Sequence, residues 1–592
     1  MGIMLWSSKS LFFLIVLLIF LLYPLNLNWK RLEIFNSRPQ TSRFHLSPAT
    51  HALRPAGTRL YNFTLAEETL WPNGVQKKVF TINGLFPGPT IEVRSGDLLV
   101  VNVHNGLSEA TSLHWHGIRH PPETQVQISP TMFRFLWSST AHSGEYHSHY
   151  STHRADGLFG ALVVHPPVSL EEDGGHRQDE LRSIRSTRFK RDAVARDSVL
   201  DQVMLVGDWY HRSGKEVLDW FQSLRSRGNE PVPDAVLNNG QQAFNCSKSI
   251  AKIICDPARG HTPTFALYPQ HRNLVRFINT GSVADIHLSL DSHLLRVIEA
   301  DGTDIQPVTV KELAIAPGQR YAVELVCIDR SMDRFWLRQR INYEDFKYPN
   351  VALDLESKSI LTYGRSRTTE HPNSVAWSDI KPGEYLDALS LRPLDPSAAI
   401  LPPADDVVMM YVTTMIRTST GNRPFGYVNQ TSWKPSSTDP ILARADSAPS
   451  SKELIYSINP IPTNISSSLI SSPSVVMDIV VNNLEDGPHP FHLHGHHFWP
   501  LYTYQAMIGP GSYRWDHPPT LPTTAPALRD TFVIPAKGHV IFRVKFDTPG
   551  LWLFHCHVLV HLQSGMGMIF DVMGDRIPLE DRINGASSCA AS

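Results

Sequence analysis

The stretch Leu553-Phe554-His555-Cys556-His557, which continues through His561 to Met566, decides how this chain is interpreted. One cysteine lies between two histidines, a third histidine follows five residues after it, and a methionine follows ten residues after it. Along a β-strand, adjacent side chains point to opposite faces and residues two apart share a face. His555 and His557 therefore face away from Cys556. The stretch predicts two separate sites joined by a few covalent bonds.

The residue types predict what the two sites bind. A thiolate, two imidazoles and a weak axial thioether form the ligand set of a blue-copper site. By counting, we assign Cys556, His561 and Met566 to such a site, with His489 as its second imidazole. His555 and His557 are then left for a second metal site.

Length and composition limit the classes of protein that fit. A chain of 592 residues should hold several domains, and three is a reasonable expectation. Charged residues make up 19% of the chain and the net charge is -2, so nothing indicates nucleic acid or an acidic polymer as a partner. The 44 prolines and 35 glycines favour a β-rich protein over a helical one.

The N-terminus carries an apolar run, residues 11–23, preceded by Lys9. This run is typical of a secretory signal and short for a membrane span, which needs about 20 residues. No small-residue cleavage site follows closely, so a cleaved signal and a membrane-anchoring signal remain as alternatives. Four glycosylation sequons agree with a secreted or cell-surface protein: Asn62, Asn245, Asn429 and Asn464. In an oxidising compartment, Cys246 and Cys255 can close a short disulfide loop.

A strand-turn-strand pattern occurs three times. Residues 98–105, 274–279 and 477–483 are strand-like, and each is followed after eight or nine residues by a histidine, at positions 114, 287 and 492. A second half-repeat matches residues 146–149 with residues 555–557. The middle copy has no histidine at the comparable place, residues 335–338. The chain is therefore expected to be all-β, with three homologous domains of which only the first and third keep metal ligands.

The predicted domain boundaries follow from these repeats and from the composition between them. We expect an N-terminal signal or anchor with a stem (1–57), domain 1 (58–168), a charged loop (169–197), domain 2 (198–367), a linker (368–405) and domain 3 (406–592).

Four histidine clusters predict a metal centre between domains 1 and 3. They are His114-Trp115-His116, His147-Ser148-His149, His489 to His494, and His555 to His561. Each H-x-H pair puts two imidazoles on one strand face. After the Cys556 site takes its ligands, eight histidines remain, enough for three coppers sharing them as three, three and two. The in-register His114 and His492 are the natural pair for the two-ligand copper.

Other metal proteins fit this pattern less well. Structural zinc prefers closed four-ligand sites rich in cysteine, whereas here one cysteine accompanies ten histidines. A two-domain nitrite reductase also has a blue-copper site. However, the H-C-H motif assigns both neighbours of Cys556 to a second metal cluster. This chain also has three repeats, whereas that reductase has two domains.

The sequence resembles the multicopper oxidase family over about residues 58–575, closest to the laccase-like enzymes of fungi, with ascorbate oxidases and ferroxidases as relatives. The histidine clusters match the family's four copper signatures at every ligand. The resemblance implies three cupredoxin-like Greek-key β-sandwiches and four coppers. The implied ligands are His489, Cys556, His561 and Met566 for type 1; His114 and His492 for type 2; and His116, His147, His149, His494, His555 and His557 for type 3.

The resemblance also implies an activity. A small reductant gives single electrons to the Cys556 copper through the edge of His561. The electrons then pass through the Cys556 backbone to His555 and His557, and O2 is reduced to water. Because Met566 supplies an axial sulfur, we expect a modest reduction potential. The motifs do not specify the oligomeric state.

Two acidic residues bear on the reductant. The segment Gly207 to His211 resembles the laccase form, and the resemblance implies that ferroxidases carry glutamate where Asp208 stands. We therefore expect phenols or similar aromatic reductants, with Fe(II) as the alternative. Asp285 falls near a substrate-facing acid of laccases, and an ordinary surface-loop aspartate is the other interpretation.

The match fails in one segment of domain 1. His147 follows His114 by 33 positions, whereas His555 follows His492 by 63, so about two strands are missing. The family's Asp-Gly turn and a cysteine are absent there, which leaves Cys589 without its implied partner. Cys327 has no obvious partner either.

Three explanations follow from the short segment. They are a gene model that lacks an exon, a divergent enzyme, and a protein that binds copper without turnover. In the stretch between His116 and His147, we single out Glu123 as the carboxylate that could take the place of the missing aspartate. His153 replaces the family's frequent glutamine, and we expect it to be a packed or exposed histidine rather than a copper ligand.

Overall fold

The structure is a computed structural model that describes residues 43–118, 133–136, 142–167, 199–249, 253–364, 370–381, 383–435, 441, 454–459 and 474–574. The chain divides into two compact units, residues 1–45 and 46–592, and every element below belongs to the second unit. Within the described residues, no helix is long and apolar enough to cross a membrane. The apolar run at residues 11–23 lies outside them.

The N-terminal β-sandwich has two four-stranded sheets, with strand orders β2-β1-β4-β6 and β3-β8-β7-β5. Its strands are β1 (Thr58–Leu70), β2 (Lys77–Ile82), β3 (Ile91–Arg94), β4 (Leu98–Asn105), β5 (Leu113–His116), β6 (Phe133–Leu136), β7 (His142–Ser148) and β8 (Phe159–His165).

The middle β-sandwich is built from sheets of six and five strands, with orders β10-β9-β12-β17-β14-β15 and β11-β19-β18-β13-β16. Its strands are β9 (Val199–Trp209), β10 (Ala235–Asn238), β11 (Thr264–Leu267), β12 (Arg272–Asn279), β13 (Ile286–Leu290), β14 (His293–Ala300), β15 (Thr303–Val310), β16 (Glu312–Ile315), β17 (Arg320–Cys327), β18 (Arg334–Ile341) and β19 (Glu356–Tyr363).

The C-terminal β-sandwich has two five-stranded sheets, with orders β21-β20-β23-β27-β25 and β22-β29-β28-β24-β26. Its strands are β20 (Asp406–Arg417), β21 (Arg423–Val428), β22 (Ile455–Ile458), β23 (Val475–Asn483), β24 (His489–Leu493), β25 (Phe498–Gln505), β26 (Thr531–Ile534), β27 (Gly538–Phe546), β28 (Gly550–Cys556) and β29 (Gly567–Val572).

Short helices connect the strands. The α-helices are α2 (Pro48–Ala52), α5 (Gly214–Phe221) and α6 (Leu559–Gln563), and η3 (His153–Asp156) is a 3-10 helix. Further 3-10 helices are η4 (Cys246–Lys248), η5 (Pro257–Arg259), η6 (Tyr343–Asp345), η7 (Pro396–Ala399) and η8 (Thr418–Thr420). Helix α5 begins at a capping box, in which Ser213 accepts from the backbone N–H of Glu216 and Glu216 accepts in return.

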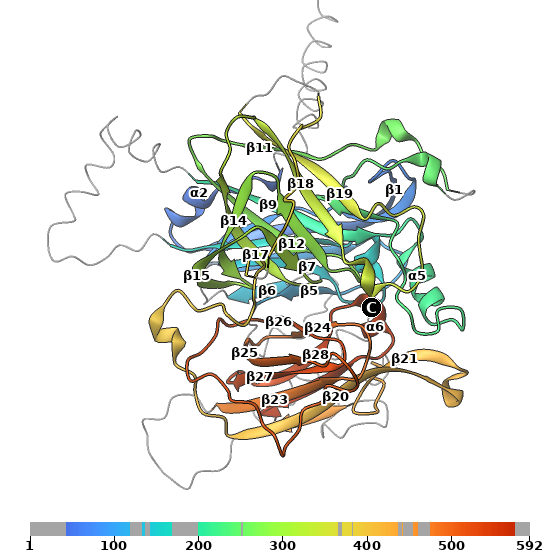
Figure 1. Ribbon diagram of the computed structural model, residues 1–592, viewed down its shortest axis with the longest axis vertical. Helices are drawn as coiled ribbons and strands as arrows, with labels where there is room; N and C mark the ends of the chain where they lie inside the picture. The colour runs from blue at the N-terminus through green and yellow to red at the C-terminus, as the bar shows by residue number, and fades with distance from the viewer. Residues whose placement is uncertain are drawn as a thin grey trace, which may run out of the picture. The chain divides into compact units, whose positions relative to one another are not determined.

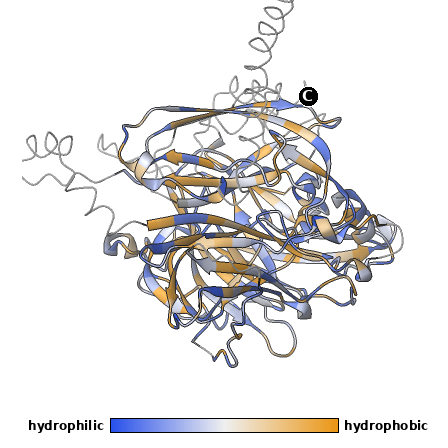
Figure 2. Ribbon diagram, turned by 90° about the horizontal axis from the view of Figure 1, so that it is seen from above, coloured by the Kyte–Doolittle hydropathy of each residue, from blue (hydrophilic) through white to orange (hydrophobic). Residues whose placement is uncertain are grey.

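Alternating side chains build the three cores. In β3, for example, Ile91 and Val93 are buried, whereas Glu92 and Arg94 between them are half-exposed. Figure 2 shows apolar and polar segments succeeding one another along the strands. Strands that lie deep in the molecule are buried on both faces, as β8 is along its whole length. In a strand with this alternation, one face is apolar and the other is polar. Each sheet therefore needs a second sheet packed against its apolar face, which gives a sandwich.

The three sandwiches share one topology, as the repeat predicts. In each of them the first strand pairs in parallel with the strand of the repeated motif: β1 with β4, β9 with β12, and β20 with β23. These parallel pairs within otherwise antiparallel sheets arise from Greek-key connections. The fold is all-β with three cupredoxin-like sandwich domains. The residue boundaries given above for the domains stay predictions.

The shortened segment of domain 1 has a structural counterpart. In the C-terminal sandwich, β25 and β26 lie between β24 and β27 in the sequence. In the N-terminal sandwich, β6 follows β5 and pairs with β4 just as β27 pairs with β23. Among the described residues, no strand corresponds to β25 or β26. Glu123 falls outside the described residues.

The N- and C-terminal sandwiches meet through the strands that carry the histidines. Figure 1 shows β5 and β7, in blue-green, next to β24, β26 and α6, in red. Arg320 of β17 lies where all three sandwiches meet and is fully buried. Its guanidinium donates to the Ser143 carbonyl at 3.1 Å and to the Asp530 carboxylate at 2.7 Å. A buried arginine with partners on both sides fixes how the histidine strands face each other.

Candidate metal centre

Cys556 forms one three-residue group with His489 and His561. The Sγ atom of Cys556 lies 3.6 Å from Nδ1 of His489 and 3.5 Å from Nδ1 of His561. The two Nδ1 atoms are 3.1 Å apart. All three side chains are buried. One sulfur and two ring nitrogens therefore converge on a single point away from solvent.

Three elements bring this group together. His489 begins β24, Cys556 ends β28, and His561 lies in the short helix α6 that follows. Met566 begins the return of the chain towards β29, and its carbonyl accepts a hydrogen bond from the N–H of Cys556 at 3.1 Å. The Met566 side chain is fully buried. The backbone bond holds Met566 beside Cys556, where the sequence predicts an axial ligand.

His561 connects this group with the half-exposed side chain of Glu230. Its Nε2–H donates to Oε1 of Glu230 at 2.8 Å. Burial alone lowers the pKa of His561, but the charge and hydrogen bond of Glu230, together with the Cys556 thiol, raise it well above the usual value. Because Nε2 is committed to Glu230, Nδ1 is the nitrogen that faces Cys556.

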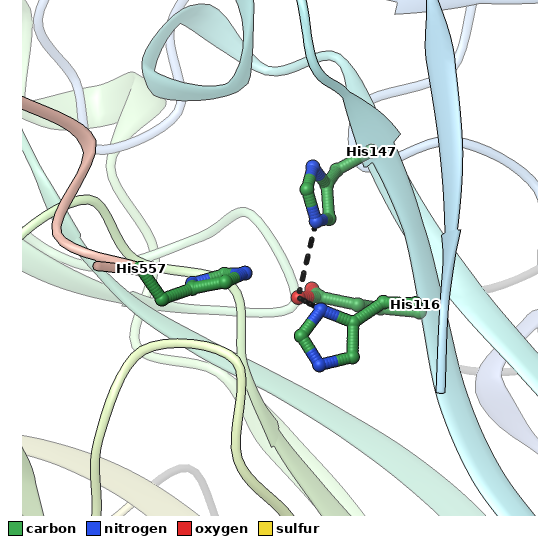
Figure 3. A group of neighbouring side chains, drawn as sticks. His116, His147 and His557 are labelled. Carbon is green, nitrogen blue, oxygen red and sulfur yellow. Dashed lines mark ion pairs between the residues drawn. The ribbon is translucent and has the colours of Figure 1, made fainter. Parts of the chain in front are cut away.

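A second group consists of His116, His147 and His557, which point toward one another in Figure 3. His116 ends β5, His147 lies in β7, and His557 follows β28. Glu145 lies among them, with Oε1 3.9 Å from Nδ1 of His116 and 3.9 Å from Nε2 of His147. The four potential ligand atoms all lie within 4.8 Å of one another.

The remaining histidines form a third group and a bridging pair. Nε2 of His555 lies 3.1 Å from Nε2 of His494 and 3.4 Å from Nε2 of His149. Nε2 of His114 lies 3.3 Å from Nε2 of His492. The three groups share eight imidazoles, four from each of the two sandwiches. The structure thus brings together every predicted histidine ligand, and His555 and His557 lie in different groups from Cys556.

Hydrogen bonds outside the cluster select the ring nitrogen that each histidine turns inward. The Nδ1 atoms of His147, His492 and His555 donate to backbone carbonyls at 3.0, 2.9 and 2.9 Å. Their Nε2 atoms are left for a ligand. In His116 the two ring nitrogens exchange these roles. Nε2 lies 3.1 Å from Thr531 Oγ1, so Nδ1 is the nitrogen left for a ligand. Such contacts fix the tautomer and the ring orientation of metal-binding histidines.

The donor set fits copper. Nδ1 of His116 and Nε2 of His147 are buried without a hydrogen-bond partner, which a bound cation would supply. Burial lowers the pKa of His116, His147 and His557 well below the usual value, so their imidazoles are neutral, the form that binds metal. Imidazole with a single thiolate suits copper better than calcium or magnesium, which prefer oxygen.

Gly117 explains why a glycine follows the H-x-H motif of β5. Its φ of +84° is a conformation that favours glycine. A Cβ atom at this position would overlap the Arg320 guanidinium and lie 3.1 Å from Oδ2 of Asp530. The glycine therefore lets the His116 strand approach the buried ion pair of Arg320 and Asp530.

Asp208 binds the backbone of a turn through one of its carboxylate oxygens. Its Oδ1 accepts hydrogen bonds from the backbone N–H groups of residues 282, 283 and 284, at 2.8, 3.1 and 3.2 Å. The side chain is 6% exposed. These contacts make Asp208 a structural anchor for a turn of the middle sandwich. Its other oxygen, Oδ2, is buried without a hydrogen-bond partner. The predicted role of Asp208 in substrate binding stays a prediction.

Asp285 lies in the same turn, half-buried. Burial, and to a lesser degree the charge of Asp345, raise the pKa of Asp285 to about 7, although His287 acts in the opposite direction. Within the described part of the chain, no hydrogen bond or ion pair joins Asp285 to the Cys556 group. Its predicted substrate role stays a prediction.

The remaining sequence predictions have mixed outcomes. The disulfide between Cys246 and Cys255 is present. Cys327 is a free, half-buried thiol. His153 is a packed histidine whose Nδ1 lies 3.1 Å from the Thr111 hydroxyl, as predicted. Cys589, Asn464 and the whole of the charged loop 169–197 fall outside the described residues.

Comparisons with known proteins agree with this geometry. Three family models, each described as multicopper oxidase, match residues 51–169, 201–359 and 432–576. The chain belongs to the multicopper oxidase family. Copper is the cofactor that this membership implies, and the three matches follow the order of the three sandwiches.

Relatives in this family carry several names. Laccase-1 of Cryptococcus neoformans var. neoformans serotype D is 29% identical over 535 residues, covering 86% of this chain and 79% of the relative. Iron transport multicopper oxidase FET3 of Gibberella zeae is 27% identical over 560 residues, covering 91% and 80%. L-ascorbate oxidase of Cucurbita pepo var. melopepo is 27% identical over 550 residues, covering 85% and 93%. Such similar identities do not single out one reductant.

Two solved structures share the fold. Fet3p, a multicopper oxidase that functions in iron import, aligns with a TM-score of 0.72 at 21% identity, covering 90% of this chain and 95% of that structure. The laccase from Botrytis aclada aligns with a TM-score of 0.70 at 24% identity, covering 91% and 92%.

Three carboxylates at this multicopper centre were missed by the sequence analysis. Glu145 lies two residues before His147, a spacing that places both on one strand face and was available as a signal. Asp530 lies 3.3 Å from His116, 414 residues away in sequence. Glu230 lies in a loop far from His561, and no local pattern connects the two.

Proposed function

We propose that this protein is a four-copper oxidase that couples one-electron oxidation of a small reductant to the reduction of O2 to water. The proposed ligands are His489, Cys556, His561 and Met566 for type 1 copper. His114 and His492 are proposed for type 2 copper, with His116, His147 and His557 for one type 3 copper and His149, His494 and His555 for the other. The observation that carries the proposal is the position of Cys556 between two histidines that belong to two other groups.

The protein's own residues do the positioning. When bound, copper supplies the one-electron redox couples, and the protein fixes geometry and excludes water. His561 presents Nε2 towards Glu230, so a reductant approaches the Cys556 group at this edge. The peptide bonds on either side of Cys556 then connect this group with His555 and His557. Burial of all three residues keeps bulk water away from the path.

Two carboxylates favour Fe(II) as the reductant. Oε2 of Glu230 and Oε1 of Glu485 are buried without a hydrogen-bond partner. Burial, and then the charge of Glu230, raise the pKa of Glu485 to about 7, while His561 acts in the opposite direction. Two carboxylate oxygens beside the His561 edge form an environment that a divalent cation with oxygen ligands would stabilise. A neutral phenol would bring no cation to these two oxygen atoms.

An aromatic reductant is the second candidate. A pocket of about 660 Å3 lies beside α6, lined by aromatic side chains that include Phe425, Tyr427 and Trp433. This volume is in the range of small-molecule sites. The pocket reaches His149 and Leu562, but neither His561 nor Glu230 lines it. The Glu230 contact with His561 therefore carries more weight for the choice of reductant.

Turnover with the two reductants tests the proposal. O2 uptake would be measured with Fe(II) and with a diphenol for the wild type, Glu230→Gln and Glu485→Gln. Glu67→Gln, on the exposed face of β1, serves as the control. For Fe(II) we expect kcat/KM to fall about tenfold or more in the first two variants, the size of one charge-assisted hydrogen bond. Efficient diphenol turnover with no Fe(II) oxidation would reverse the choice.

The same measurement separates an oxidase from a copper-binding protein without turnover. A blue protein that takes up no O2 with either reductant would support the inactive binder. The complete ligand set favours the oxidase, and the short segment of the N-terminal sandwich favours the binder.

We also propose entry into the secretory pathway. Asn62, Asn245 and Asn429 are exposed, as glycosylation sites must be, and the Cys246–Cys255 disulfide suits an oxidising compartment. A drop in apparent mass on treatment with an N-glycosidase would support this proposal. An unglycosylated protein recovered from the cytosol would contradict it.

A further inference from the structure

Glu145 occupies an unusual place for a carboxylate. Its side chain is fully buried in the group formed by His116, His147 and His557. The dashed line from His147 in Figure 3 marks the ion pair with this carboxylate, at 3.9 Å. Neither Oε atom has a hydrogen-bond partner. A carboxylate in such surroundings costs several kcal/mol unless a cation or donors compensate it.

The neighbouring groups do not fully compensate Glu145. Arg154 and Arg320 act on it only through their charges, and each makes its hydrogen bonds elsewhere. Arg154 donates to the His557 carbonyl at 2.7 Å, and Arg320 donates to Asp530. The ring nitrogens that face the carboxylate, Nδ1 of His116 and Nε2 of His147, also lack partners. One cation at the centre of the group would satisfy all of these atoms at once.

The distances suit a shared ion. Nitrogen and carboxylate ligands lie about 2.0–2.2 Å from a first-row divalent ion, so two ligands of one ion are at most about 4.4 Å apart. Both separations between Glu145 and the histidine nitrogens, at 3.9 Å, fall inside this limit. The strand adds a second argument. Glu145 and His147 lie two residues apart on one face of β7, and His149 follows just after the strand, so the H-x-H motif is extended to E-x-H-x-H.

We propose that Glu145 is the fourth protein ligand of the copper held by His116, His147 and His557. The inference rests on the proposed four-copper function and adds an anionic oxygen ligand to one copper only. The repeat provides the contrast. Where β7 has Glu145, two residues before His147, β28 has Leu553, two residues before His555. The group of His149, His494 and His555 therefore contains imidazoles alone.

A single anionic ligand makes the two type 3 coppers unequal. A carboxylate stabilises the more highly charged, oxidised ion relative to the reduced one. The copper beside Glu145 is therefore harder to reduce than the copper at His149, His494 and His555. This asymmetry is expected to appear in copper affinity and in spectra, independently of turnover.

The decisive experiment is copper-edge diffraction on the copper-loaded wild type. It is combined with copper counting and dialysis against a chelator for Glu145→Gln, Glu145→Leu and Glu145→Asp. We expect a Glu145 oxygen about 2.0–2.2 Å from one copper. The Gln and Leu variants should lose one copper at a chelator concentration at least about tenfold lower than the wild type. The Asp variant keeps the charge and should be intermediate.

The blue colour of the Cys556 site reports folding in every variant. A wild type with four coppers in which no Glu145 oxygen bonds to metal overturns the inference and leaves the proposed function intact. Retention of all four coppers by Glu145→Leu with unchanged chelator resistance also overturns it. A folded wild type that binds no copper in any of the groups refutes the proposed function, and the inference with it.

Discussion

Nε2 of His116 lies 3.3 Å from Oδ1 of Asp530, although the two residues belong to different sandwiches. Asp530 in turn accepts from Arg320 at 2.7 Å, and its backbone carbonyl accepts from His492. One residue therefore orients a proposed type 3 ligand and a proposed type 2 ligand. Burial alone would raise the pKa of the Asp530 carboxyl. The positive charge of Arg320 outweighs burial and keeps this pKa well below its usual value.

We predict that Asp530→Asn weakens copper binding at the cluster while sparing the Cys556 site. The amide keeps the shape but removes the charge that fixes the His116 tautomer, and such outer contacts contribute about 10–100-fold to metal affinity. Removing one of the two carboxylate partners of the buried Arg320 should also cost up to about 3–5 kcal/mol of stability. Copper counting and thermal unfolding measure both effects. Asp478→Asn, which breaks the ion pair with Arg543 elsewhere in the same sandwich, is the control. Equal copper loss in both variants would contradict this role of Asp530.

Removing the thiolate should separate the two copper systems. In Cys556→Ser we predict loss of the blue colour and of O2 uptake with any reductant, with copper retained at the eight-histidine cluster. A hydroxyl cannot replace the soft thiolate, whereas the cluster histidines stay on their strands. Visible absorption, electron paramagnetic resonance and copper counting provide the measurement. Cys327→Ser removes the other described free thiol and should change none of these. A variant that loses all copper would show that the sites are not independent.

The axial position sets the reduction potential of the Cys556 copper. Replacing Met566 by leucine removes a weak sulfur ligand, and we predict a higher potential, because the axial ligand tunes this value at blue-copper sites. Redox titration of the blue band is the measurement. Met568→Leu, a change of the same kind two residues further along and equally buried, should leave the potential unchanged. Equal shifts in both variants would mean that repacking of the core, rather than ligation, is responsible.

The sequence was sufficient to predict features that depend on short-range geometry. Alternation along one strand separates Cys556 from His555 and His557, and the repeat pairs His114 with His492 across two domains. These predictions need only the strand period. Glu230 is different, because it reaches His561 through loop and helix geometry that no periodic pattern encodes.

A local resemblance does not reveal every contact of a residue. Asp208 matches a family segment, yet its side chain is bound to the backbone of residues 282–284, which only the tertiary structure places beside it. For Glu145, the sequence provides only part of the information. Its spacing from His147 is visible in the sequence, but a glutamate at that spacing acquires meaning only when both oxygens prove to be buried among imidazoles.

Asp285 provides a test of the fold that does not depend on copper. Its pKa of about 7 exceeds the value of 3.8 expected in the unfolded chain. Between these two values the folded protein holds a proton that the unfolded chain has lost, so the free energy of unfolding falls as pH rises through this window. Below it both states are protonated and the penalty is absent; above it the full penalty applies.

We therefore predict that Asp285→Asn is more resistant to urea than the wild type at pH 8, and that the advantage shrinks steadily as pH is lowered from 7 towards 4. The asparagine cannot ionise, so it escapes the cost of a charged group beside Asp345. Urea midpoints at a series of pH values measure the effect. Asp219→Asn, on the exposed face of α5, should show no such pH trend. A constant difference between Asp285→Asn and the wild type at every pH would mean that the substitution acts through packing or hydrogen bonding and not through the ionisation of Asp285.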